Sequence, residues 1–375
     1  MAETINICDL ATEVSEDIFT WFKWDVIDLY DENFDCRKPE DHKKKKKGDA
    51  ISDVSDADQE SSDIVEKELK HTHPVDVVFK YRDPYLGKDI LLNTDLKSYA
   101  SSSIRPGDVR DMLQSIAKTI DCANISPEWK TRYAIRSEKY EIRGMLFIYN
   151  HDGKYHRNFY DVFKTTIPVG SERKKLGINL TSIGLKKNQQ IHIVEPLIIS
   201  YMTTIIADVD RLHREGTFPR DEYYFYYPEL IRHKTIGGDK STRPATIEAI
   251  CAPYLIIEHD DVITKTKGSN EEKIYKAGYV IYYNMRGENP YEFVYLFDTL
   301  SRYQILNGEH NIRIRFAHYN PDPDICSNFD KAIDIYVKNW GYDEYKKKML
   351  QRIETKELTL KEYCFKTKEV ARKSK

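Results

Sequence analysis

Residues 72–100, THPVDVVFKYRDPYLGKDILLNTDLKSYA, decide how the rest of the chain is interpreted. Two apolar runs, Val75–Tyr81 and Ile90–Ser98, are typical of strands. The segment between them contains Pro84 and Gly87, which favour a turn. The stretch therefore predicts a β-hairpin, and the polar residues that interrupt its apolar runs need an explanation.

The interrupting residues are Asp76 in the first strand and Asp95 and Lys97 in the second. Residues i and i+2 of a strand share a face, so Asp95 and Lys97 point the same way. If the hairpin is centred between Tyr85 and Leu86, Asp76 lies opposite Asp95. Two carboxylates opposed in this way repel each other, and a chain accepts such a pair where a divalent cation lies between them. The register therefore predicts a site for Mg²⁺ or Mn²⁺.

Lys97 has a chemical role beside such a metal. A bound metal ion lowers the pKa of a water molecule. The ammonium of Lys97 can orient that water and offset the charge that builds on a phosphate in the transition state. A third acid from the amphipathic helix predicted over residues 11–24 would complete the ligand set. We choose Glu16, with Glu13 and Asp17 as the alternatives.

The order of these parts is an acidic helix, an acid on a strand, a turn, D-x-K on the next strand, and another helix. That order resembles the PD-(D/E)XK nuclease superfamily over about residues 10–145. The residues that carry the resemblance are Pro74 and Asp76 in HPVD, and Asp95-Leu96-Lys97 in NTDLKSY. The resemblance implies an α/β fold with a restriction-endonuclease-like mixed sheet core and flanking helices. It also implies hydrolysis of phosphodiester bonds with Mg²⁺.

The resemblance further implies a role for each site residue. Glu16, Asp76 and Asp95 would hold the metal, and the backbone carbonyl of Leu96 would also face it. Lys97 would assist the attacking water. An alternative interpretation of the same residues is a surface hairpin whose Asp and Lys side chains face water, but VDVVF and ILLNTDL are typical of buried strands.

The composition of the chain changes along its length. Residues 37–70 combine a lysine block with an Asp/Ser-rich block and few aromatics, which predicts a flexible charged insertion within a nuclease domain over residues 1–145. Residues 146–345 predict a second α/β region for recognition or partner binding, and residues 346–375 a basic C-terminal segment. Residues 1–100 hold 24 Asp/Glu and 14 Lys/Arg, whereas residues 101–375 hold 37 and 44. This asymmetry is compatible with a metal centre beside a surface that binds a polyanion, although tails and an insertion produce the same counts.

The six cysteines are scattered and include no CxxC motif, which predicts reduced thiols in a cytoplasmic protein and argues against a zinc site. For His71 and His73 we favour a hydrogen bond or exposure over a metal role. We find no glycine-rich phosphate loop and no apolar run long enough for a membrane helix, so we expect no nucleotide cofactor and no membrane association.

The sequence thus predicts a Mg²⁺-dependent endonuclease that acts on DNA. A cytoplasmic nuclease must be restrained, so we expect a partner protein subunit, a homo-oligomer or a trigger. By analogy with bacterial proteins of similar organisation, antiphage defence is the expected setting. The alternative is a non-catalytic interaction or nucleic-acid-binding protein on a nuclease-like scaffold.

Overall fold

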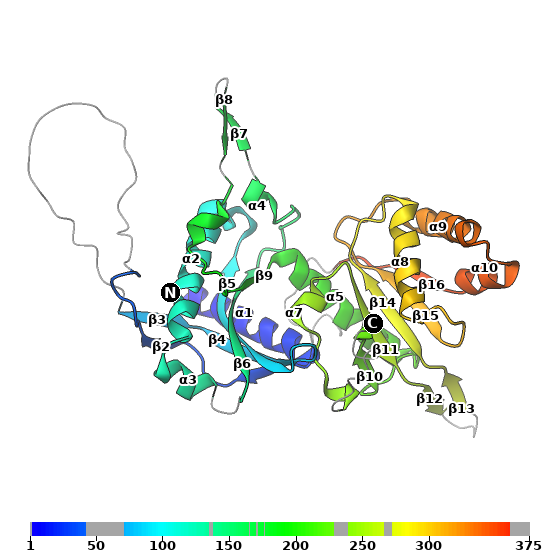
Figure 1. The fold of residues 1–375 in the computed structure, drawn as a ribbon, viewed down its shortest axis with the longest axis horizontal. Coiled ribbons are helices and arrows are strands. Elements are labelled where there is room, and N and C mark those ends of the chain that lie inside the picture. The colour runs from blue at the N-terminus through cyan, green and yellow to red at the C-terminus, as the bar shows by residue number, and fades with distance from the viewer. Residues whose placement is uncertain are drawn as a thin grey trace, which may run out of the picture.

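The structure is a computed structural model, and it describes residues 2–42, 71–134, 138–164, 166–169, 172–175, 177–228, 239–265 and 272–360. Two mixed sheets with helices on their faces form the body of the molecule (Figure 1). Within the described part, no helix combines the length and apolarity that crossing a membrane requires.

The first sheet contains the predicted hairpin. Its five strands lie in the order β1-β4-β5-β6-β9. β4 and β5 pair antiparallel and connect through the turn at Pro84 and Gly87, and β5, β6 and β9 run parallel to one another. The strands are β1 (Asp25–Ile27), β4 (Val77–Asp83), β5 (Lys88–Tyr99), β6 (Tyr140–Asn150) and β9 (Ile191–Val194). A mixed sheet core with flanking helices is confirmed.

The predicted register of the hairpin is also confirmed. Tyr81 pairs with Ile90, and Val78 pairs with Asn93. The regular ladder begins at Val77, one residue after Asp76. Asp76 therefore lies at a bend between strands rather than inside a ladder pair.

Helices cover both faces of this sheet. α1 (Ala2–Trp21) packs on one face, where the ring of Phe19 contacts those of Phe79 in β4 and Phe147 in β6. α2 (Pro106–Ala123) packs on the other face, against Val78 and its neighbours. The apolar residues of α2 recur at helical spacing, so one stripe of the helix is buried.

One glycine permits the close approach of α2 to the sheet. A Cβ atom built at Gly144 in β6 would lie 2.4 Å from Cγ2 of Ile116 on α2. A side chain there would push the helix away from the strand.

Smaller elements complete the first half of the chain. β2 pairs antiparallel with β3, and β7 pairs antiparallel with β8. Their bounds, and those of the short helices nearby, are β2 (Glu32–Asp35), β3 (Thr72–Val75), η1 (Ser101–Ser103), α3 (Pro127–Tyr133), α4 (Asp161–Lys164), β7 (Thr166–Val169), β8 (Glu172–Lys175) and η2 (Leu180–Ile183).

The second sheet has the order β10-β11-β14-β15-β16. Helices α8 and α9 pack their apolar faces against it, and β12 and β13 form a separate hairpin. The elements are β10 (Tyr223–Phe225), η3 (Lys240–Thr242), α7 (Ile247–Ile250), β11 (Tyr254–His259), β12 (Val262–Lys265), β13 (Glu272–Tyr275), β14 (Gly278–Tyr283), α8 (Pro290–Arg302), β15 (Asn311–Phe316), α9 (Ile325–Trp340), α10 (Glu344–Gln351) and β16 (Glu354–Glu357).

Helix α5 (Pro196–Arg214) lies between the two sheets. Its buried residues belong to the same apolar cluster as Phe147 of the first sheet and Ile257 of the second. A buried ion pair also joins α5 to the second sheet, because Oδ2 of Asp208 lies 3.3 Å from Nε of Arg315 in β15. The two sheets therefore share one apolar cluster around α5, while the opposite face of each sheet packs in a cluster of its own.

The structure differs from the expected organisation at several boundaries. β6 continues through residue 145 to Asn150 and pairs with β9, so the first sheet extends beyond the expected domain end. Residues 37–42, expected to begin the flexible insertion, are ordered against α2: the backbone N–H of Arg37 donates to Sγ of Cys122, and Lys38 pairs with Asp121. Residues 43–70 lie outside the described part.

The C-terminal half differs from expectation at its end. The expected basic segment 346–375 contains the end of α10 and then β16, which pairs parallel with β15, while residues 361–375 lie outside the described part.

Candidate active site

Asp76 follows the end of β3 and precedes β4, and two hydrogen bonds fix its position. Its backbone carbonyl accepts from the N–H of Asp31 at 3.0 Å. Its side-chain Oδ2 accepts from the N–H of Leu96 at 2.7 Å. The carboxylate of Asp76 thus reaches across to the strand that carries Asp95 and Lys97.

Asp95 and Lys97 lie on one face of β5, as the alternation of the strand requires. The ammonium of Lys97 donates to Oδ1 of Asp95 and, at 3.2 Å, to the carbonyl of Leu96. The same nitrogen lies 3.8 Å from Oδ2 of Asp76. The ammonium of Lys97 therefore contacts both carboxylates and also the carbonyl of Leu96, which the sequence predicted to lie near them.

The electrostatics of this group reflect its crowding. Burial, followed by the negative charge of Asp95, raises the pKa of Asp76 to about 6. Burial alone would lower the pKa of Lys97, but the charges of Asp95 and Asp76 outweigh it and raise that pKa above its ordinary value. Lys97 is therefore an ammonium at neutral pH. Asp76 is ionised at that pH as well, and its negative charge lowers the stability of the folded protein.

The group is also accessible. The side chains of Asp76, Asp95 and Lys97 are 25%, 20% and 29% exposed. Two carboxylates and one ammonium leave a formal charge of −1. Oxygen ligands with this charge, partly open to solvent, fit the requirements of a hard divalent cation that keeps some of its water.

Glu16, the predicted third acid, contacts a residue next to Asp31 and not the group itself. It lies on α1 and forms a hydrogen bond with the hydroxyl of Tyr30, whose pKa is raised by burial and then by Glu16. The next residue, Asp31, donates its N–H to the carbonyl of Asp76. The structure thus brings Asp76, Asp95, Leu96 and Lys97 together directly, whereas Glu16 makes no hydrogen bond or ion pair with any of these four in the described part of the chain.

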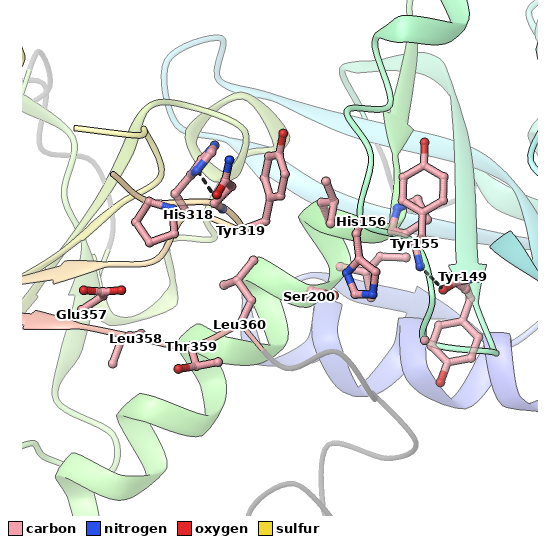
Figure 2. Close-up of a pocket in the computed structure, with 17 residues that line it drawn as sticks. Tyr149, Tyr155, His156, Ser200, His318, Tyr319, Glu357, Leu358, Thr359 and Leu360 are labelled. Carbon is pink, nitrogen blue, oxygen red and sulfur yellow. Dashed lines mark hydrogen bonds between the residues drawn. The ribbon is translucent and has the colours of Figure 1, made fainter. Parts of the chain in front are cut away.

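A cavity of about 420 Å³ lies elsewhere, between the two halves of the molecule (Figure 2). Tyr149, Tyr155 and His156 line it from the first half, and His318 and Glu357 from the second. None of the predicted site residues lines this cavity. The Asp76–Lys97 group is therefore a separate, surface-facing site.

The sequence interpretation missed one cluster. Cys36 and Cys122, expected to be apart, have Sγ atoms 3.8 Å apart. His42 and His73 complete a group whose ligand atoms all lie within 4.8 Å of one another. The expectation of scattered cysteines is wrong for this pair, because folding joins segments that no local sequence spacing relates.

Comparison with known proteins agrees with the geometry of the first half. No curated protein and no solved structure matches the chain. A family model described as "GAPS4 protein PD-(D/E)XK nuclease domain" matches residues 1–197, more than half of the chain. The matched range contains all strands of the first sheet, together with Asp76, Asp95 and Lys97. The chain belongs to the family of PD-(D/E)XK nuclease domains of GAPS4 proteins.

Proposed function

We propose that the protein is a metal-dependent endonuclease that hydrolyses phosphodiester bonds of DNA. The observation that supports this most directly is the meeting of Asp76, Asp95 and Lys97 at one partly exposed point of the first sheet. Asp76 and Asp95, with Glu16 and the carbonyl of Leu96, would hold Mg²⁺ or Mn²⁺. When bound, the ion would activate a water molecule and stabilise negative charge on the scissile phosphate.

The protein's own groups have distinct roles in this proposal. Lys97 stays protonated because two carboxylates face it, so it donates hydrogen bonds to the attacking water and does not act as a base. The N–H of Leu96 orients the carboxylate of Asp76. The net negative charge of the group repels a phosphate until a cation is bound, so substrate and metal bind cooperatively.

The test is cleavage by the full chain with Mg²⁺, Mn²⁺ or EDTA. Plasmid DNA, linear DNA, single-stranded DNA and RNA serve as substrates. We expect metal-dependent cleavage of DNA that falls by about 10²–10³-fold in both Asp95→Asn and Lys97→Met. Cleavage that survives both substitutions contradicts the assignment of the site. Binding of DNA without any metal-dependent cleavage, with or without a partner, favours the non-catalytic alternative.

The third metal ligand can be tested separately. We expect Glu16→Gln to lower the cleavage rate by about 100-fold or more, because it removes a ligand charge. The matched controls are Glu13→Gln and Asp17→Asn on the same helix, which should stay within a few-fold of wild type. Thermal unfolding of all three variants checks that α1 remains packed. If either control lowers the cleavage rate more than Glu16→Gln does, the residue changed in that control is the third metal ligand instead.

We also propose bacterial antiphage defence as the setting, with DNA as substrate and a partner protein or a second copy as the means of restraint. The support is the analogy of domain organisation drawn from the sequence. The test is phage plating efficiency on bacteria that express the wild type or Asp95→Asn. Equal plating on both strains, across phages against which the wild type protects, would contradict a defence role for the nuclease.

A further inference from the structure

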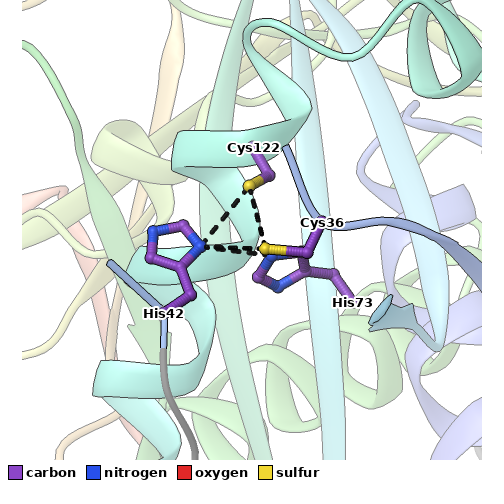
Figure 3. Close-up of side chains that lie close together, drawn as sticks. All are labelled: Cys36, His42, His73 and Cys122. Atoms are coloured by element: carbon purple, nitrogen blue, oxygen red, sulfur yellow. Dashed lines mark hydrogen bonds between the residues drawn. The ribbon is translucent and has the colours of Figure 1, made fainter. Parts of the chain in front are cut away.

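A second group of metal-ligating side chains lies apart from the proposed nuclease residues (Figure 3). Cys36 follows β2, His42 lies in the turn region after it, His73 is in β3, and Cys122 is in the last turn of α2. His42, His73 and Cys122 are buried, and Cys36 is half-buried. Four residues from three separate segments thus direct one soft or borderline ligand atom each to a common point.

Four of the six distances between these ligand atoms match the edges of a tetrahedron around zinc, and all six are within 4.8 Å. Bond lengths of about 2.3 Å to sulfur and about 2.0–2.1 Å to nitrogen place tetrahedral ligands about 3.8 Å apart for two sulfurs, about 3.3 Å for two nitrogens and about 3.6 Å for a mixed pair. The Sγ atoms of Cys36 and Cys122 are 3.8 Å apart. Nδ1 of His42 and Nε2 of His73 are 3.3 Å apart. Nδ1 of His42 lies 3.5 Å from Sγ of Cys36 and 3.4 Å from Sγ of Cys122.

The hydrogen bonds of the two rings fix which nitrogens face the centre. Nδ1 of His73 lies 3.3 Å from Oγ1 of Thr119, whose hydroxyl donates to the carbonyl of Ser115. Thr119 therefore accepts from Nδ1–H of His73. Nε2 of His42 lies 3.4 Å from Oδ2 of Asp121, so that nitrogen is the donor in the other ring. Both remaining lone pairs then point into the cluster, where they would repel each other unless a cation lies between them.

The surroundings are those of a metal ligand set. A carboxylate beside the non-ligating nitrogen of histidine, as Asp121 lies beside Nε2 of His42, is the usual outer partner of a zinc-bound imidazole. The backbone N–H of Arg37 donates to Sγ of Cys122 at 3.3 Å, which stabilises thiolate character. Both cysteines are free thiols, because the distance between their Sγ atoms is much longer than a disulfide bond.

We propose that Cys36, His42, His73 and Cys122 form a structural Zn²⁺ site. Two sulfur and two nitrogen ligands in tetrahedral arrangement select zinc over the hard cations, and four protein ligands leave no open position for catalysis. The ion joins the segments on either side of residues 43–70 to the end of α2. It also holds β3, whose end leads directly into Asp76.

The experiment measures metal in the full chain, purified without a histidine tag from zinc-supplemented cells. We expect one zinc per chain by inductively coupled plasma mass spectrometry, falling to near zero in Cys36→Ser and in Cys122→Ser. Cys251→Ser and Cys326→Ser, which change exposed cysteines, are the matched controls and should retain the zinc. Asp95→Asn should also retain it, so this test stands independently of the nuclease assignment.

A spectroscopic measurement on the wild type covers the case in which the cysteine variants do not fold. Replacing zinc by Co²⁺ should give the visible bands of tetrahedral cobalt and the near-ultraviolet charge transfer of cobalt–thiolate bonds. Wild type that contains no zinc and gives no such bands overturns the proposal. A Cys36–Cys122 disulfide in the purified protein, detected by mass spectrometry, overturns it as well.

Discussion

We expect Asp76→Asn to abolish metal-dependent cleavage and, in EDTA, to make the protein more stable than the wild type. The side-chain oxygen of asparagine can still accept from the N–H of Leu96, so the local geometry is retained. The substitution removes a partly buried charge that faces Asp95. The two effects have one cause, since the repulsion that favours a cation also weakens the metal-free fold.

The stabilisation depends on pH with a definite sign. The pKa of Asp76 is raised from 3.8 to about 6 in the folded state, so between these values the folded protein binds a proton that the unfolded chain has lost. The wild type therefore loses stability as pH rises through this range. We expect no gain from Asp76→Asn below about pH 4, and a gain of about 1–3 kcal/mol above pH 6, after allowance for partial exposure.

Thermal or urea unfolding in EDTA at pH 4, 5, 6 and 7.5 measures this gain. The matched control is Asp111→Asn on α2, whose side chain is 64% exposed and should change stability little at any of these pH values. A stability gain that is equal at pH 4 and pH 7.5 contradicts the electrostatic explanation. Cleavage at wild-type rate by Asp76→Asn contradicts its assignment as a metal ligand.

Asp208→Ala is expected to destabilise the protein by about 3–5 kcal/mol, the usual cost of removing one partner of a buried ion pair. Asp208 is 5% exposed. Its carboxylate accepts from Arg211 at 2.6 Å and from the hydroxyl of Tyr282 at 3.0 Å, and it lies 3.3 Å from Nε of Arg315. The side chain of Arg315 is 1% exposed, so among the described residues the substitution leaves the buried guanidinium with the more exposed Glu354 as its one ion-pair partner.

The control lies two residues along the same helix. Asp210 pairs with Arg214 at 3.1 Å, and both side chains are more than a third exposed. Exposed pairs of this kind contribute about 0–1 kcal/mol, so Asp210→Ala should shift the unfolding midpoint little. Urea unfolding compares the two variants. A loss in Asp208→Ala no larger than that in Asp210→Ala would show that the network does not hold the sheets together.

The predictable part of the molecule is local. The turn at Pro84 and Gly87 and the alternation of apolar residues determine the β4–β5 register, and D-x-K places Asp95 and Lys97 on one face. The exact place of Asp76 was less predictable, because its carboxylate accepts from the backbone of Leu96 instead of pairing across the ladder. Glu16 stays a prediction, since it makes no hydrogen bond or ion pair with Asp76, Asp95 or Lys97 among the residues that the structure describes.

The features that sequence could not predict depend on long-range contacts. No spacing along the chain relates Cys36 and Cys122, which α2 and the β2–β3 pair bring together. The sequence also placed β9 in the second region, although it pairs with β6 of the first sheet. The sequence of a short strand before a helix does not indicate which sheet the strand joins. Position within a sheet follows from which apolar faces meet, and that information is spread over the whole sequence.

Helix α5 has a consequence for how the protein can be controlled. The family match ends at residue 197, whereas α5 begins at Pro196 and packs on both sheets. A fragment that ends at residue 197 would lack α5. Phe147 and the apolar residues beside it would then be exposed to solvent, so we expect the fragment to be insoluble. Residue 197, where the match ends, lies within the first turn of this continuous helix. Any displacement imposed on the second sheet by a bound partner would be passed through one continuous helix to the strands beside Asp95 and Lys97.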